Sequence, residues 1–310
     1  MNIEKRPELK SILHSKRANI FYLQHCKVMQ KTGRVLYLTK NDNKNLYYNI
    51  PIANTTCILL GNGTSITQAA TKILAKAGVM IGFCGGGGTP LISAQEVEWI
   101  SPQSEYRPTE YLQRWVKFWF DDNKRFVAAK TIQQKRIDYI RKIYSCDKFL
   151  YDNNIFLRDY IDVINEFEKN INKSENINKL LSYEGLFTKK IYSIISEKTN
   201  IDFKRNYKSK DSANEKLNHG NYLAYGLAAS STWVLGIPHS LAVLHGKTRR
   251  GGLVFDIADL VKDAIVLPLS FICASNEFTE SEFRKYCLQS FIRNKSLDYM
   301  FEVIKEISEI

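Results

Sequence analysis

Cysteines are few in this sequence, and none are paired in the spacing that binds zinc. The six cysteines lie between Cys26 and Cys287 without a C-x-x-C motif, which argues against a cysteine-based metal or redox site. Several occur in apolar runs such as TTCILL and SFICAS, where cysteine serves as a small core residue. This usage indicates a reducing compartment rather than a disulfide-linked secreted protein.

A long hydrophobic run is also missing. The longest apolar stretch, AIVLPLSFICA, is too short to span a bilayer and contains Pro268. The first residues, MNIEKRPELK, are charged and do not have the apolar centre of a signal peptide. We therefore expect a soluble cytoplasmic protein with no membrane partner.

Acidic residues are outnumbered by basic ones. The chain has 44 Lys and Arg against 32 Asp and Glu, a net charge of +12, and the excess is strongest in the first third. This balance favours a polyanionic partner, and nucleic acid before an anionic membrane. Charge that serves only solubility remains the alternative. With 310 residues, 44% of them hydrophobic, the chain can form one large or two ordinary domains.

The first hundred residues have the pattern of β-structure. Between residues 11 and 60, short segments rich in β-branched and aromatic residues alternate with turn residues, which predicts strands. The segment 65–78 has the pattern of an amphipathic helix, with Thr64 or Ser65 as its N-cap and Gly78 as its stop. A further strand, VMIGFC, is expected directly after this helix.

From Thr109 onward the pattern is helical. A long helix is expected first, with Trp115 and Trp119 one turn apart and basic residues on the opposite side. We therefore predict an α+β fold. Residues 1–102 are expected to form an N-terminal β-rich domain, β-sandwich-like with one helix, and residues 103–310 an all-helical C-terminal domain.

The run HGKTRRGGLVFDIADL contains the most informative residues. His245 precedes Asp256 by 11 residues and Asp259 by 14. Because the two aspartates are three positions apart, their carboxylates face the same side of a helix. An imidazole nitrogen and two carboxylates suit a divalent metal that acts on a phosphate. A capped helix with a satisfied histidine is the alternative that spacing alone leaves open.

Three cations lie between the histidine and the aspartates: Lys247, Arg249 and Arg250, followed by two glycines. Such a cationic turn is well placed to hold phosphates beside a metal ion. An exposed cationic loop without a ligand is the alternative.

Glu184 lies upstream in LLSYEGLFTKKIY, a mostly apolar and aromatic helical segment. A carboxylate in these surroundings is either at a helix boundary or buried, and a buried carboxylate needs a partner or a metal. An exposed glutamate beside Gly185 is the competing interpretation.

A polar helix is expected after Asp211, with Asn214 and Asn218 one turn apart. Their amides could form hydrogen bonds with a neighbouring catalytic element or with a DNA phosphate. An N-capped polar helix face explains the same pattern.

With these residues assembled, the chain resembles the CRISPR-associated adaptation integrases, the Cas-one family, and specifically their type I-F branch. The stretches HSKRANIFYL and YRPTEYLQRW are similar to that subtype. Family-wide motifs are YEG at 183–185, D-x-x-N-x-x-L-N at 211–218, and HGKTRRGGLVFDIADLVKD. These motifs occur in the family's order over nearly the whole length.

The resemblance implies a metal-dependent DNA endonuclease and integrase of prokaryotic antiviral defence. Its members insert short foreign DNA fragments into a CRISPR array, where the 3′-hydroxyl of the fragment attacks a phosphodiester at the repeat. Glu184, His245 and Asp259 match the metal ligands, and Asp256 matches the accompanying acid. Such a ligand set accommodates Mn²⁺ as well as Mg²⁺.

The resemblance also implies partners: double-stranded DNA, a second copy of the chain in a homodimer, and a Cas-two protein fused to the Cas-three helicase-nuclease. Two alternatives remain. One is a catalytically silent DNA-binding or assembly subunit, and the other is a metal-dependent nuclease without an integrase role.

Overall fold

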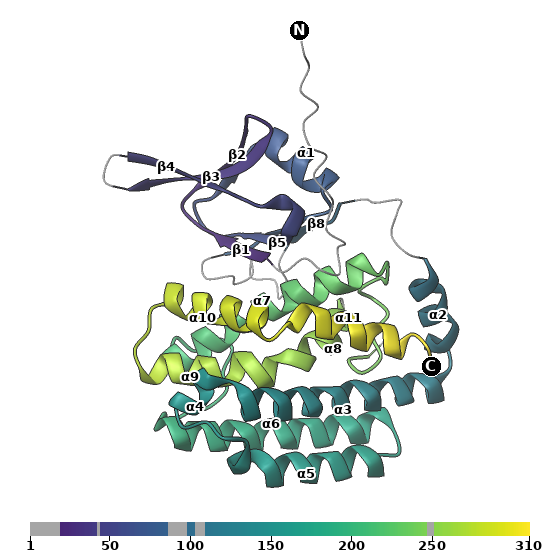
Figure 1. Ribbon diagram of the computed structural model, residues 1–310. Helices are drawn as coiled ribbons and strands as arrows, with labels where there is room; N and C mark the ends of the chain where they lie inside the picture. The colour runs from purple at the N-terminus through teal and green to yellow at the C-terminus, as the bar shows by residue number, and fades with distance from the viewer. Residues whose placement is uncertain (1–18, 42–43, 86–97, 103–108, 247–250) are drawn as a thin grey trace.

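The strands, together with one helix (Gln68–Lys76), occupy one part of the molecule, and the other helices occupy the rest (Figure 1). The computed structural model describes residues 19–41, 44–85, 98–102, 109–246 and 251–310. The predicted α+β class is confirmed, because a strand-rich N-terminal part lies against a helical C-terminal part. The boundary expected after residue 102 adjoins a segment, 103–108, that is outside the described residues.

Two four-stranded sheets form the N-terminal part. The first has the order β1 (Asn19–Leu23), β5 (Thr55–Leu60), β7 (Met80–Phe83), β8 (Glu98–Ile100), with the first three strands parallel and β8 antiparallel to β7. The second has the order β4 (Lys44–Asn49), β3 (Arg34–Asn41), β2 (Lys27–Lys31), β6 (Ser65–Ile66). A short 3-10 turn, Ile52–Asn54, leads into β5.

The central strand β5 explains how the two parts of the chain are joined. All six of its residues, TTCILL, are buried. Ile58 and Leu60 pack into a core shared with the second sheet and with the helix after β6, whereas Cys57 and Leu59 pack into the core of the helical part. Successive side chains of a strand point to opposite faces, so one apolar run serves both cores. The first sheet is therefore covered on both sides.

The helix after β6 begins later than expected. Helix α1 spans Gln68–Lys76, and its N-cap is Thr67 rather than Thr64 or Ser65. The earlier residues are taken up by β6, which pairs in parallel with β2. The stop at Gly78, which has a φ of +71°, is as predicted, because glycine tolerates this left-handed conformation.

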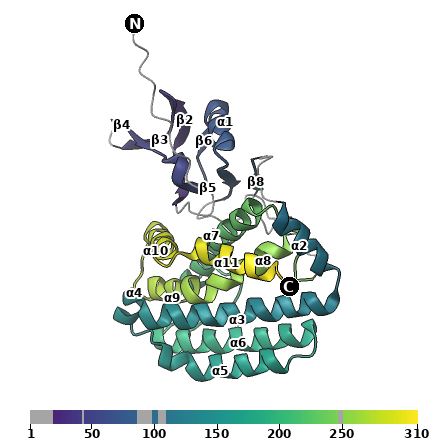
Figure 2. The same cartoon turned by 45° about the vertical axis from the view of Figure 1, so that its right-hand side comes forward.

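The helical part is layered. Helices α3 (Asp122–Cys146), α5 (Leu157–Lys173) and α6 (Ile177–Thr199) lie side by side on the side away from the sheets (Figures 1 and 2). Helix α7 (Ser212–Val234) is central and packs against β5. The other helices are α2 (Glu110–Trp119), α4 (Lys148–Asp152), α8 (Gly252–Val261), α9 (Leu267–Ser275), α10 (Glu280–Arg293) and α11 (Ser296–Ile307). No helix in the described ranges is long and apolar enough to cross a membrane.

The long helix expected from Thr109 is in fact two helices. Helix α2 ends at Trp119, and the carboxylate of Asp121 starts α3 by accepting hydrogen bonds from the backbone N–H groups of Asn123 and Lys124. The periodicity continues across the break, which is why the pattern alone did not show it. An aspartate is a strong N-cap, so it ends one helix and begins the next.

The two tryptophans of α2 are bonded to a distant segment. Trp115 donates its indole N–H to the carbonyl oxygen of Leu241 at 3.1 Å, and Trp119 donates to that of Ala242 at 2.7 Å. These bonds hold the backbone that leads directly to His245. Helix α2 therefore helps to position one of the candidate site residues.

Candidate metal centre and active site

A cavity of about 370 Å³ opens between α3, α6, α7 and α8. Its wall includes Glu184, His245 and Asp259, which the sequence motifs had singled out as metal ligands. Cations and a further acid also line it: Arg136, Lys189, Arg205, Lys262 and Asp263. The fold thus brings together residues from several helices and from the segments around Arg205 and His245, which are far apart in the sequence.

The imidazole of His245 is held by Asp256. This carboxylate is fully buried and accepts hydrogen bonds from the backbone N–H groups of Val243 (2.7 Å), Leu244 (3.1 Å) and His245 (3.1 Å). Its Oδ1 also lies 2.6 Å from the Nδ1 of His245. Because an ionised carboxylate only accepts, Nδ1 carries the proton and Nε2 is the ring atom left for a ligand.

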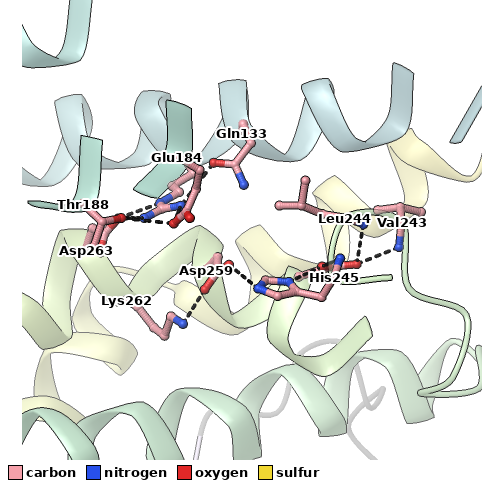
Figure 3. Close-up of polar contacts among 11 residues, drawn as sticks. Gln133, Glu184, Thr188, Val243, Leu244, His245, Asp259, Lys262 and Asp263 are labelled. Carbon is pink, nitrogen blue, oxygen red and sulfur yellow. Dashed lines mark hydrogen bonds and ion pairs between the residues drawn. The ribbon is translucent and has the colours of Figure 1, made fainter. Parts of the chain in front are cut away.

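The free face of His245 is directed at Asp259 (Figure 3). Nε2 of the ring lies 3.9 Å from Oδ2 of Asp259, which is too long for a hydrogen bond. The other oxygen, Oδ1, is bound by the ammonium group of Lys262, one turn further along the chain.

Charges around the pair shift both pKa values. Burial lowers the pKa of His245, but the hydrogen bond to Asp256 and the charges of Asp259 and Asp256 outweigh it, so the pKa is raised. Burial raises the pKa of the Asp259 carboxyl, but Lys262, His245 and Arg136 outweigh it, so this pKa is lowered. The carboxylate therefore stays ionised.

Glu184 lies in the middle of α6, not at a helix end. Its Oε1 accepts hydrogen bonds from Nη1 of Arg136 (2.8 Å) and from the hydroxyl of Thr188 (3.0 Å). Its side chain is 24% exposed, so Glu184 is half-buried, which matches neither the buried nor the exposed glutamate that the sequence left open. Among the described residues no hydrogen bond reaches Oε2.

The side chains of Glu184, His245 and Asp259 are held in the same way. Each has one atom bound by a neighbouring side chain, and each retains a second donor atom: Oε2 of Glu184, Nε2 of His245 and Oδ2 of Asp259. Two ligands about 2.1 Å from one ion stand about 3 to 4.2 Å apart. The 3.9 Å between Nε2 and Oδ2 falls in that range.

The donor chemistry therefore fits a divalent ion. Within the described part of the chain, no three His, Cys, Asp or Glu side chains already stand together as a ligand set. His245 and Asp259 form a pair at a suitable separation, and Glu184 lines the same cavity with its Oε1 held by Arg136 and Thr188.

Several residues at the site were given no role in the sequence analysis, although Lys262 and Asp263 end the motif HGKTRRGGLVFDIADLVKD. Lys262 and Asp263 follow Asp259 by three and four positions, so helical spacing could have indicated them. They lie in a π-helical turn, Lys262–Val266, that joins α8 to α9. Arg136 lies on α3, far from the motifs, and no local signal distinguishes it from other helix arginines.

The two asparagines of α7 hold an arginine at the cavity wall. The side-chain oxygens of Asn214 and Asn218 accept from the two terminal nitrogens of Arg205, each at 2.7 Å. Their amide nitrogens donate to the carbonyl oxygens of Lys204 and Tyr207. The amides therefore fix the loop before α7 and place Arg205 beside the cavity. Contact of the asparagines with DNA stays a prediction.

The predicted cationic turn cannot be placed. Lys247, Arg249 and Arg250 fall in 247–250, outside the described residues. On its far side, Gly251 has a φ of +65° and forms the N-cap of α8. The prediction that these cations contact phosphates stays open.

Comparison with known proteins identifies the family. The family model described as CRISPR associated protein Cas1 matches residues 21–301. A protein of Pectobacterium atrosepticum named CRISPR-associated endonuclease Cas1 is 52% identical and aligns with 97% of this chain and 95% of its own. A protein of the same name from Pseudomonas aeruginosa is also 52% identical and aligns with 97% of this chain and 96% of its own.

Solved structures share the fold. A Cas1 protein from Thermotoga maritima superimposes with a TM-score of 0.72 at 17% identity, covering 94% of this chain and 96% of its own. The TtCas1-DNA complex gives a TM-score of 0.67 at 18% identity, covering 93% and 91%. A Cas6-RT-Cas1–Cas2 complex gives 0.66 at 12% identity, covering 94% of this chain and 34% of that one. From the family match and the two relatives, the chain belongs to the CRISPR-associated Cas1 family.

Proposed function

We propose that this protein is a divalent-metal-dependent DNA endonuclease and integrase that inserts short foreign DNA fragments into a CRISPR array. The observation that carries the proposal is the shared arrangement of Glu184, His245 and Asp259 around one cavity, each with one atom held and a second donor atom that no other described residue hydrogen-bonds. The 52% identity to two proteins named Cas1 endonucleases supports it.

In this reaction the 3′ oxygen of the fragment forms a bond to phosphorus, and the bond from phosphorus to a 3′ oxygen of the target strand breaks. When water takes the place of the fragment, the same site cleaves DNA. A divalent ion held by Glu184, His245 and Asp259 supplies Lewis-acid stabilisation of the charge on the phosphate. The imidazole accommodates Mn²⁺ as well as Mg²⁺.

The chain's own residues prepare this site. Asp256 keeps the proton on Nδ1 of His245, so that Nε2 presents a lone pair. Lys262 holds Oδ1 of Asp259 and adds positive charge to the wall of the cavity that we propose for the scissile phosphate. Arg205, fixed by Asn214 and Asn218, adds a second cation at the cavity wall.

Basic residues continue outward from the cavity. The loop FKRNYKSK leads from α6 to α7, with Lys204, Lys208 and Lys210 exposed. Tyr207, which is 76% exposed, carries the guanidinium of Arg205 over its ring at 4.0 Å. Such a surface suits a DNA backbone that enters the site. We also propose that Lys247, Arg249 and Arg250, which lie outside the described residues, contact DNA phosphates.

The proposed partners follow from the family. One solved Cas1 was determined with DNA, and another occurs in a complex with Cas2. We propose that this chain binds double-stranded DNA as a homodimer and works with a Cas2 protein that is fused to Cas3. All six cysteines are free, which agrees with a cytoplasmic site of action.

A strand-joining assay tests the proposal. A short duplex with 3′-hydroxyl ends is incubated with a repeat-bearing plasmid and Mn²⁺ or Mg²⁺, with and without the Cas2 partner. We expect joined product with the unchanged protein and none with Asp259→Asn. Cleavage without joining would indicate a nuclease only, and binding without either would indicate a silent assembly subunit.

A further inference from the structure

We propose that Arg136 is a positioning residue of the metal centre, which holds one oxygen of Glu184 so that the other is presented to the ion. This inference rests on the proposed function for its relevance, but it concerns metal binding, which can be measured without DNA. Nothing in the sequence motifs assigns a role to this arginine.

The guanidinium of Arg136 is 2% exposed, and every N–H group on it has an acceptor. Nε donates to Oδ2 of Asp263 at 2.6 Å, and Nη1 donates to Glu184 at 2.8 Å and to Oε1 of Gln133 at 3.1 Å. Nη2 donates to the hydroxyl of Thr188 at 3.2 Å and contacts Asp263. A fully bonded guanidinium is rigid, because its planar fork fixes the direction of each bond.

Glu184 is held from two directions as a result. Thr188, one turn further along α6, donates its hydroxyl to the same Oε1 and accepts from Arg136. The three side chains close a triangle of hydrogen bonds that orients the carboxylate (Figure 3). Groups that orient a metal ligand in this way commonly change metal affinity about 10- to 100-fold when removed.

The anchors of Arg136 come from different elements. The arginine is on α3, Glu184 is on α6, and Asp263 is in the π-helical turn after α8. Through these bonds, Arg136 links α6, which contributes Glu184, to the segment of chain that contributes Asp259. Among the described residues only Oε1 of Glu184 accepts hydrogen bonds, so Oε2 can serve a ligand.

A competing role for Arg136 predicts that its loss would strengthen metal binding instead of weakening it. If Arg136 merely occupied the place of the cation, its loss would relieve charge repulsion and tighten metal binding. Arg136→Lys separates the two roles, since lysine keeps the charge but has no planar fork. A positioning role predicts weaker binding in this variant, although the net charge of the site is unchanged.

The experiment is a Mn²⁺ titration followed by electron paramagnetic resonance, without DNA, on the full chain. Thr188→Val keeps Arg136 and the approximate shape of the side chain, and it removes the second donor to Oε1. The matched control is Arg141→Lys, because Arg141 is also on α3 but pairs with Glu168 away from the cavity. Thermal unfolding without metal shows which variants fold.

We expect Arg136→Lys to bind Mn²⁺ about 10- to 100-fold more weakly, with a broadened spectrum of the bound ion, while Arg141→Lys binds normally. If Arg136→Lys does not fold, Thr188→Val decides, with weaker binding again expected. Unchanged or tighter binding in the deciding variant overturns the proposal. Normal Mn²⁺ binding by the unchanged protein without strand joining would refute the proposed function and leave the role of Arg136 intact.

Discussion

Replacement of Asp256 by asparagine is expected to lower the free energy of unfolding substantially and to weaken metal binding without abolishing it. The carboxylate is fully buried and accepts four hydrogen bonds, three from backbone N–H groups and one from Nδ1 of His245. An amide keeps one oxygen and replaces the other with an NH₂ group, which only donates. If the oxygen stays with His245, the NH₂ group faces the N–H groups of Val243 and Leu244.

The size of the effect follows from these bonds. A hydrogen bond to a charged acceptor contributes about 1.5 to 3 kcal/mol, so two lost bonds cost about 3 to 6 kcal/mol before the segment relaxes. We expect Asp256→Asn to lower the free energy of unfolding by about 3 kcal/mol. Because His245 keeps a partner, Mn²⁺ should still bind, about 10- to 100-fold more weakly.

Asp259→Asn is the matched comparison on the same helix. Its amide oxygen can still accept from Lys262, so the loss of stability should be smaller. It removes an anionic ligand, so the loss of Mn²⁺ affinity should be larger. Urea unfolding gives the free energies, and Mn²⁺ titration gives the affinities. An Asp256→Asn variant as stable as the unchanged protein, or one that binds Mn²⁺ less well than Asp259→Asn, would refute the assigned roles.

Three further outcomes are expected. Because the pKa of His245 is raised, protons compete with Mn²⁺ for its imidazole at a higher pH than they would for an ordinary histidine. The Mn²⁺ affinity should therefore fall as the pH is lowered from about 8 to about 6. Without metal, the contribution of this histidine to the free energy of unfolding should be present at low pH and lost as the pH rises through the raised pKa. Trp119→Phe removes the bond to Ala242 and should cost about 1 kcal/mol in urea unfolding, and an unchanged free energy of unfolding would contradict the role of this bond. DNA affinity measured by fluorescence anisotropy should fall roughly a thousandfold between about 50 and 200 mM salt if about six phosphates are contacted, and a flat profile would contradict the basic surface.

Much of the local structure was predictable from the sequence. The run TTCILL has the composition of a strand buried on both faces, and the i, i+3 spacing of Asp256 and Asp259 placed both carboxylates toward one histidine. The continuous helix from Thr109 was wrong because periodicity outlasts a helix break, and only the cap at Asp121 marks it. These local features depend on residues that are close to one another in the sequence, within one or two turns of a helix.

The sequence by itself determined which chemical groups are available. These are a histidine, two aspartates that share one helix, and a glutamate in an apolar segment of a different helix. Tertiary structure alone decided which atoms of those groups are held and which are free. Arg136 is 48 positions from Glu184 and 127 from Asp263. No periodicity links residues at such separations, because their contact depends on how α3, α6 and the π-helical turn pack. The packing of these elements decides which carboxylates the buried guanidinium of Arg136 binds, and those bonds orient the side chains of the site.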